Sequence, residues 1–342
     1  MSATEYALVA PLFMSDELLN RFDIVGVDPR GIGSSRMFPD RFRALAIDGV
    51  IDARAWVGNT RQILDERINS SGGASKTLAE ILRRCDQAGE KACPFAVGDP
   101  VRNFDTITLR LKAKPLVIGD RTITYADFIR DVHLAMFWPT ADEKVTTFVA
   151  EIGAALDGDT AALLRRLETA ATTEPYVNGY EAIFGVICAD GRFPAKAAHW
   201  PAAVAAREKA APYFGGSALA WKDTTCASST WTVRDEDAYT GPFDRRTAAP
   251  VLVVGSFWDP ATNYAGAVST SRQMPNSRLL SSNDWGHTAY ALSACATAAM
   301  DAYLLTGKPP ARDTVCADAP EPFTEQGQTF AERRGKHLLT VR

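Results

Sequence analysis

Residues 249–290 read APVLVVGSFWDPATNYAGAVSTSRQMPNSRLLSSNDWGHTAY, and this stretch decides the fold. The apolar, largely β-branched run Val251–Val254 has the pattern of a strand buried on both faces. Asp259 lies just past its end, and His287 stands near the close of the stretch. Between these two residues the sequence predicts a helix and a second short strand, over residues 265–274 and 278–280. Because neighbouring parallel strands end at the same edge of a sheet, we expect Asp259 and His287 to meet there.

Either residue alone has a simpler interpretation. An Asp after a strand is usually a turn or helix cap, and a single His is usually packed or solvated. The two residues in this order, each following a predicted strand, favour instead a carboxylate that orients an imidazole for acid–base chemistry.

A second signal lies upstream, where residues 22–35 read FDIVGVDPRGIGSS. The sequence predicts a strand over Phe22–Asp28, and glycines 31 and 33 permit a tight turn after it. A phosphate-binding loop is the alternative for such glycines, but the spacing is neither G-x-G-x-x-G nor a Walker motif. Residues 43–48, RALAID, predict a further buried strand.

From residue 55 to about residue 247 the apolar spacing is mostly helical. Helices are predicted over residues 77–85, 125–137, 145–156, 160–171, 180–188 and 201–213, with a further one over 291–305 and a small hairpin over 115–124. We interpret the region as a helical cap over the carboxyl edge of the sheet, where it would govern substrate selectivity. Its large aromatic residues either line a pocket or, as is more usual, fill the core; they are Phe137, Trp138, Trp200, Tyr213, Phe214, Trp221 and Trp231.

Composition limits the classes of function. The 342 residues are 46% hydrophobic and carry a net charge of −4 without a basic cluster, which argues against a nucleic-acid partner. No apolar run is long enough to span a bilayer, and residues 1–19 lack the pattern of a signal peptide. No cofactor motif and no metal-ligand spacing is recognised, so neither a cofactor nor a metal is expected.

The six cysteines are even in number and fall into three sequential couples. The pairing predicted from this order is Cys85–Cys93, Cys188–Cys226 and Cys295–Cys316. Disulfides would suit an exported protein, whereas six buried thiols in a cytoplasmic enzyme are the alternative.

Several strings together resemble a known family. They are FDIVGVDPRGIGSS, FPDRFRALAIDGVIDARAW, the segment Cys188-Ala-Asp, PVLVVGSFWDPATNY, NDWGHTAY and Thr314-Val-Cys316. They are similar to secreted bacterial tripeptidyl aminopeptidase-like α/β hydrolases, relatives of prolyl aminopeptidases, over residues 22–323. The resemblance implies an α/β-hydrolase fold, a peptide or a small ester or amide as substrate, and a secreted or cell-envelope location. It implies that Asp259 orients the imidazole and that His287 is the general base and acid. It also places cysteines 188, 226, 295 and 316 at positions where family members carry cysteines.

The sequence departs from the family at the nucleophile. No serine has glycine at both −2 and +2, so the G-x-S-x-G elbow is missing. Ser35 is followed directly by residues 36–40, where the family has a strand, the nucleophile and a helix, and the glycine-rich oxyanion loop is not found either. Ser34 and Ser35 are the remaining candidates, because both lie near the edge to which His287 should point.

This departure predicts an incomplete parallel sheet and little or no serine-hydrolase activity. A peptide-binding pseudoenzyme and a truncated product that folds poorly are the alternatives. The oligomeric state is not indicated. The expected division of the chain is a first part of the core, a helical cap, a second part of the core and a tail, over residues 1–54, 55–247, 248–325 and 326–342.

Overall fold

The structure, a computed structural model, describes residues 10–25, 42–169, 179–233 and 238–324. Ser34 and Ser35, the glycine-rich turn before them and the predicted tail lie outside these ranges.

A four-stranded sheet forms the base of the molecule, and its strands are β1 (Leu45–Asp48), β4 (Val251–Trp258), β5 (Arg278–Trp285) and β6 (Val315–Cys316). The order is β1-β4-β5-β6, and each neighbouring pair is parallel. Within the described ranges, β1 pairs with β4 alone and leaves its other edge without a strand partner. The predicted parallel sheet is therefore confirmed, whereas its being incomplete stays a prediction.

Three of the sequence-based strand assignments need correction. The two central strands are longer than predicted, because they pair beyond Gly255 as far as the register of Trp258 with Trp285. Of the strand predicted over Phe22–Asp28, the described part, Phe22–Val25, is not in a strand. An isolated extended segment has no backbone partner, and a strand needs one to be stable.

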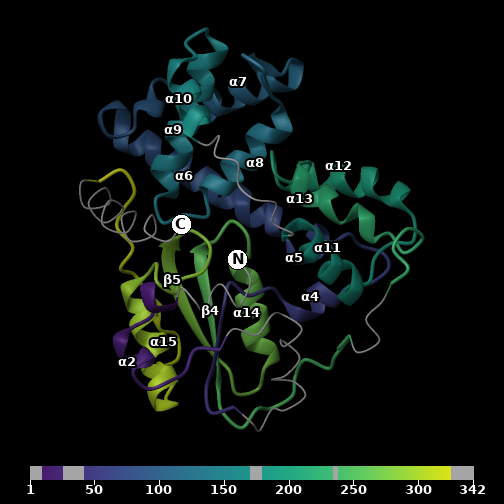
Figure 1. The fold of residues 1–342 in the computed structure, drawn as a ribbon, viewed down its shortest axis with the longest axis vertical. Coiled ribbons are helices and arrows are strands. Elements are labelled where there is room, and N and C mark those ends of the chain that lie inside the picture. Colours follow the sequence, from purple (N-terminus) through teal and green to yellow (C-terminus); the bar gives the residue numbers. More distant parts are fainter. Residues whose placement is uncertain (1–9, 26–41, 170–178, 234–237, 325–342) are drawn as a thin grey trace.

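Helices cover both faces of the sheet (Figure 1). Val251 and Val253 of β4 pack with Ala267 of α14 (Tyr264–Gln273), whereas Leu252 and Val254 pack on the other face against α15 (Ala294–Thr306). This alternation follows from the two-residue period of a strand. All four strand residues are fully buried, as the apolar run predicts.

The other helices are mostly short, and several lie beyond the carboxyl ends of β4 and β5 (Figure 1). Before β1 come η1 (Ala10–Leu12) and α2 (Asp16–Leu19). Between β1 and β4 lie α4 (Ala53–Val57), α5 (Leu64–Ile68), α6 (Ser70–Ala92), η3 (Pro94–Ala96), α7 (Pro100–Ala113), α8 (Tyr125–Ala135), α9 (Ala141–Leu156), α10 (Ala161–Thr169), α11 (Gly179–Asp190), η4 (Ala197–His199), α12 (Trp200–Ala210), α13 (Ala218–Trp221) and η5 (Lys222–Cys226). The predicted hairpin is confirmed as β2 (Leu116–Ile118) and β3 (Arg121–Ile123). Each predicted helix overlaps one of these elements, so the helical reading of the region holds, while its division from the core at residues 55 and 247 stays a prediction.

Helix α7 is not among the helices predicted from the sequence, although its signals are present. Asp99 accepts hydrogen bonds from two backbone N–H groups of the first turn, and Pro100 opens the helix, where a missing N–H costs nothing. Phe104, Ile107 and Leu111 recur at helical spacing and are buried. They belong to the main core of the cap, where the Phe104 ring lies 5.5 Å from the Phe128 ring.

Two stacked tryptophans join this cap to the sheet. Trp258 and Trp285 end β4 and β5, and their ring centroids lie 5.0 Å apart. From α6, the Arg84 guanidinium lies 5.4 Å from the Trp285 ring, and the Lys76 ammonium lies 4.7 Å from the Trp258 ring. These contacts combine burial with cation–π attraction and fix α6 over the strand ends.

All three predicted disulfides form, joining Cys85 to Cys93, Cys188 to Cys226 and Cys295 to Cys316. The first closes the end of α6, the second ties α11 to η5, and the third ties α15 to β6. Disulfides of this kind persist in oxidising compartments.

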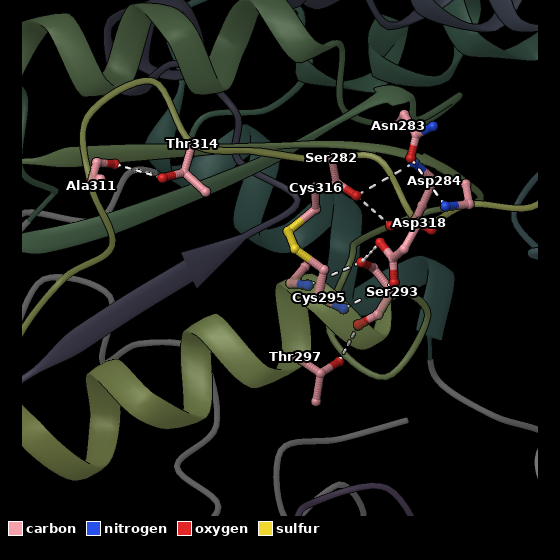
Figure 2. The surroundings of a disulfide bond; sticks show 12 residues. Ser282, Asn283, Asp284, Ser293, Cys295, Thr297, Ala311, Thr314, Cys316 and Asp318 are labelled. Atoms are coloured by element: carbon pink, nitrogen blue, oxygen red, sulfur yellow. Dashed lines mark hydrogen bonds between the residues drawn. A yellow bond between two sulfur atoms is a disulfide. The ribbon is translucent and has the colours of Figure 1, made fainter.

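The third disulfide lies in a polar setting at the start of α15 (Figure 2). Ser293 caps the helix, and its hydroxyl donates to Asp318, which also accepts from the Cys295 N–H at 3.0 Å. Asp318 and the two sulfur atoms lie close enough together to resemble a metal site. Because the sulfur atoms of Cys295 and Cys316 are bonded to each other, neither is a thiolate ligand in this state.

Candidate active site

Asp259 follows the last residue of β4 and lies in a tight loop at the carboxyl edge of the sheet. Its side chain is 2% exposed. One oxygen, Oδ1, accepts hydrogen bonds from the backbone N–H groups of Ala261 and Thr262, both at 2.8 Å. The other, Oδ2, accepts from the Thr262 hydroxyl at 2.6 Å. The loop therefore fixes the carboxylate in one orientation before any partner approaches it.

His287 follows β5 and lies against Asp259. Its Nδ1 is 2.9 Å from Oδ2 of Asp259 and 3.2 Å from Oδ1. Its backbone N–H donates to the carbonyl of Phe137, and the two rings meet edge to face at 5.3 Å. Gly286 has φ of +100°, and a Cβ there would lie 2.9 Å from the same carbonyl, so a larger residue would be strained and crowded. The structure thus brings together the two residues that the sequence paired.

A second carboxylate, which sequence analysis did not single out, holds the loop after His287. Asp48 ends β1, and its Oδ2 accepts hydrogen bonds from the N–H groups of Ala289 and Tyr290, both at 2.8 Å. The next residue, Gly49, has φ of +65° and lies beneath the imidazole, where a Cβ would be 3.0 Å from Cε1. The available signal was an Asp-Gly pair closing a predicted strand, the same position relative to a strand that Asp259 occupies.

The surroundings of the pair favour its charged form. Burial raises the pKa of Asp259, but the hydrogen bonds and charge of His287, together with the bonds from Thr262, outweigh burial and lower it overall. Burial likewise disfavours the protonated imidazole, yet the bond and charge of Asp259 and the charge of Asp48 raise the pKa of His287. With its Nδ1 proton directed at Asp259, the imidazole presents Nε2 for proton transfer. Within the described ranges no residue forms a hydrogen bond to Nε2.

His133, on α8, is a second histidine near this edge. It is 9% exposed, its Nε2 lies 3.1 Å from the carbonyl oxygen of Pro260, and its ring meets Phe137 edge to face at 5.0 Å. Burial lowers the pKa of His133 to about 4, so at neutral pH the ring is uncharged and its Nε2–H donates to the carbonyl. His133 therefore fixes α8 to the loop that carries Asp259.

Helix α6 contacts the same loop from its first turn. The Ser70 hydroxyl donates to the carbonyl of Ala261 at 2.7 Å, and the Asn263 side chain donates to the carbonyl of Asn69 at 3.1 Å. A Cβ on Gly73 would lie 3.3 Å from the carbonyl oxygen of Asp259. Close approach of the helix backbone therefore depends on glycine at this position.

The remaining candidate residues have mixed outcomes. Ser34 and Ser35 lie outside the described residues, so a nucleophilic role for either stays a prediction. Trp200 and Phe214 are fully buried and belong to the core, as is more usual for such residues. Trp138 and Trp221 are instead 45% and 41% exposed. Among these aromatic residues, as far as the structure describes them, Phe137 is the one whose ring contacts His287.

No described helix has the combination of length and apolar content needed to cross a membrane.

Comparison with known proteins agrees with this geometry. Residues 211–316 match the model of the family described as TAP-like proteins, and this segment contains both Asp259 and His287. The tripeptidyl aminopeptidase of Streptomyces lividans is 28% identical over 299 residues, covering 82% of this chain and 51% of the relative. Carboxylesterase B of Mycobacterium tuberculosis and a putative hydrolase of Mycobacterium bovis are each 25% identical over 285 residues, covering 82% of this chain and 53% of the relative. The chain thus spans about half the length of the curated relatives it matches.

These relatives are similar along most of the chain, and the family model covers the strands that carry the acid and the imidazole. The parallel sheet with helices on both faces and a helical cap is the α/β-hydrolase fold. The fold, the match of residues 211–316 and these relatives together make the chain similar to the TAP-like α/β hydrolases.

Proposed function

We propose that this chain carries the acid–base half of a hydrolase site for peptide, amide or ester bonds, in which Asp259 orients His287 and His287 transfers the proton. The observation that supports the proposal most directly is the 2.9 Å contact between Nδ1 of His287 and a buried carboxylate, with Nε2 left for a substrate or nucleophile. The relatives named tripeptidyl aminopeptidase and carboxylesterase support this range of bonds.

We further propose that the polypeptide as given has little serine-hydrolase activity. The sequence contains no G-x-S-x-G elbow, and Ser34 and Ser35 are the only serines it offers near the expected position. An imidazole without a nucleophile still acts as a general base toward water, but it lacks the covalent step that makes serine hydrolases fast. The three disulfides support a secreted or cell-envelope location.

Two measurements on the purified chain test these proposals. Hydrolysis of p-nitrophenyl acetate should be slow, should depend on neutral imidazole, and should be lost in His287→Ala while it survives in the Ser34→Ala/Ser35→Ala double variant. A fluorophosphonate probe should not label the chain stoichiometrically, although it labels an active serine esterase in the same tube.

Each result has a distinct contrary outcome. Ester hydrolysis unchanged in His287→Ala would show that the pair performs no acid–base chemistry. Stoichiometric fluorophosphonate labelling that is lost in His287→Ala would show that a serine of this chain is an active nucleophile. Loss of labelling in the double variant would place that nucleophile at Ser34 or Ser35, and the two single variants would identify which.

A further inference from the structure

The loop that carries His287 is conformationally strained. Thr288 has φ of +72° and Ala291 has φ of +63°, and neither is glycine. A β-branched residue such as threonine rarely adopts a left-handed conformation, because its Cβ then crowds the backbone. A loop of this kind keeps its shape only when its surroundings hold it there.

Asp48 supplies contacts at the point where the strain would otherwise relax. Its two hydrogen bonds are to Ala289 and Tyr290, the residues that lie between the two left-handed positions. The residues on either side of this pair also have acceptors. The Thr288 N–H donates to Asp259 at 3.3 Å, and the Ala291 N–H donates to the hydroxyl of Thr297 at 2.9 Å. Each N–H from residue 288 to residue 291 therefore has an acceptor, and Asp48 provides the two in the middle.

The sheet explains why a carboxylate from β1 reaches a loop after β5. Asp48, at the end of β1, is in register with Val254 of β4, and both strands run parallel to β5. The loop after His287 crosses the carboxyl end of β4, since the Ser256 hydroxyl lies 3.5 Å from the carbonyl oxygen of Thr288. Asp48, Asp259 and His287 thus come from three adjacent strands and meet at one edge.

The two carboxylates have opposite electrostatic character. Burial raises the pKa of Asp48 despite three backbone N–H donors, and the nearby charge of Asp259 raises it further. The pKa of Asp259 is lowered instead. Both carboxylates favour a protonated His287. Pairs of acidic groups whose pKa values shift in opposite directions are typical of sites in which each group has a different acid–base role.

From this geometry we propose that Asp48 is a positioning residue for His287: its carboxylate holds the strained loop that presents the imidazole. The charge of Asp48 is a second, electrostatic part of the same role, because it favours the protonated imidazole. The proposal rests on the acid–base role proposed above, and it assigns to Asp48 an action through the loop rather than contact with substrate. Asp259 fixes Nδ1 directly, whereas Asp48 fixes the backbone on the other side of the same residue.

The test uses the full chain without substrate and compares Asp48→Asn with Asp48→Ala. Asparagine keeps an oxygen that accepts from Ala289 and Tyr290 but removes the charge, and alanine removes both. Asp52→Asn is the matched control, because Asp52 follows β1 four residues later and caps α4 without contacting the histidine loop. The readouts are the imidazole titration of His287 by NMR and amide hydrogen exchange at Ala289 and Tyr290.

We expect the pKa of His287 to fall in both Asp48 variants and to stay unchanged in the Asp52 control. Amide protection at Ala289 and Tyr290 should fall about tenfold or more in Asp48→Ala, as loss of a hydrogen bond implies, and should be largely retained in Asp48→Asn. A purely structural Asp48 would leave the His287 titration of the folded Asp48→Asn variant at the wild-type value, and that result would overturn the electrostatic part of the proposal.

Unchanged protection at both amides in Asp48→Ala would overturn the positioning part. Neither readout requires hydrolysis, so a chain that fails the ester assay above can still confirm or refute the role of Asp48. Loss of the hydrolase proposal is thereby distinguished from loss of this one.

Discussion

Replacing Asp259 should reveal how much of the stability of this edge depends on one carboxylate. Asp259→Ala removes the acceptor for two backbone N–H groups at 2.8 Å, for the hydroxyl of Thr262 and for Nδ1 of His287. A buried donor left without a partner costs about 1–3 kcal/mol, and loss of one partner from a buried ion pair costs about 3–5 kcal/mol. Because His287 keeps 32% of its side-chain exposure, we expect the lower part of that range, about 3 kcal/mol.

Asp259→Asn should cost less. Its amide oxygen still accepts from the two backbone N–H groups, and the substitution removes chiefly the charge opposite His287. We expect a loss of about 1–2 kcal/mol, so the two variants should differ by roughly 1–2 kcal/mol in unfolding free energy.

The pH dependence of this loss has a definite sign. The pKa of His287 is raised in the folded state, so its contribution is complete below the unfolded value near 6.5 and is lost as the pH rises through the folded value. The pKa of Asp259 is lowered, so its contribution is complete above the unfolded value near 4 and is lost as the pH falls through the folded value. The penalty of Asp259→Asn should therefore be larger at pH 5.5 than at pH 9.

Urea unfolding of the wild type and both variants, followed by circular dichroism at pH 5.5 and pH 9, measures these differences. Asp157→Asn is the control, because Asp157 is 74% exposed and its ion pair with Arg110 should contribute little. Penalties under 0.5 kcal/mol for both Asp259 variants, or a penalty of Asp259→Asn that grows from pH 5.5 to pH 9, would refute this reasoning.

Two further predictions concern the cap. Burial lowers the pKa of His133 to about 4, so its contribution to the free energy of unfolding is present above pH 6.5 and is lost as the pH falls toward 4, by up to roughly 3 kcal/mol. His133→Gln should therefore flatten the fall in melting temperature between pH 7 and pH 4.5. An equally steep fall in the variant would contradict this. The Cys188–Cys226 disulfide closes a longer loop than Cys85–Cys93, with sequence separations of 38 and 8. Replacing both cysteines of a pair by alanine should therefore lower the free energy of unfolding in urea by about 4 kcal/mol for Cys188–Cys226 and by about 2.5 kcal/mol for Cys85–Cys93. The reverse order would count against the loop-entropy account.

The Asp259 and His133 predictions concern the same part of the structure, where cap helices contact the loops that carry Asp259 and His287. The His133 side chain holds Pro260, and the carbonyl of Phe137, just after α8, holds the backbone of His287. The position of the imidazole therefore depends on the cap as well as on the sheet. A substitution that loosens α8 should affect the acid loop and the base loop together.

Much of this arrangement is local and could be predicted from the sequence. The run Val251–Val254 is apolar on both faces of a strand, so it had to be buried between two layers. Asp259 and His287 each follow a strand of one parallel sheet, and that topology alone brings them to the same edge. The order of the cysteines was sufficient for the pairing, because each couple is close in sequence.

Tertiary structure alone decided the rest, because contacts between residues far apart in the chain leave no periodic signal. No pattern in residues 43–50 indicates that Asp48 accepts hydrogen bonds from residues 289 and 290, some 240 positions later. No pattern around residue 137 indicates that its carbonyl meets the backbone of His287. The chemistry of the edge was encoded in short strings, whereas the groups that hold its strained loop were fixed only when the strands and the cap packed together.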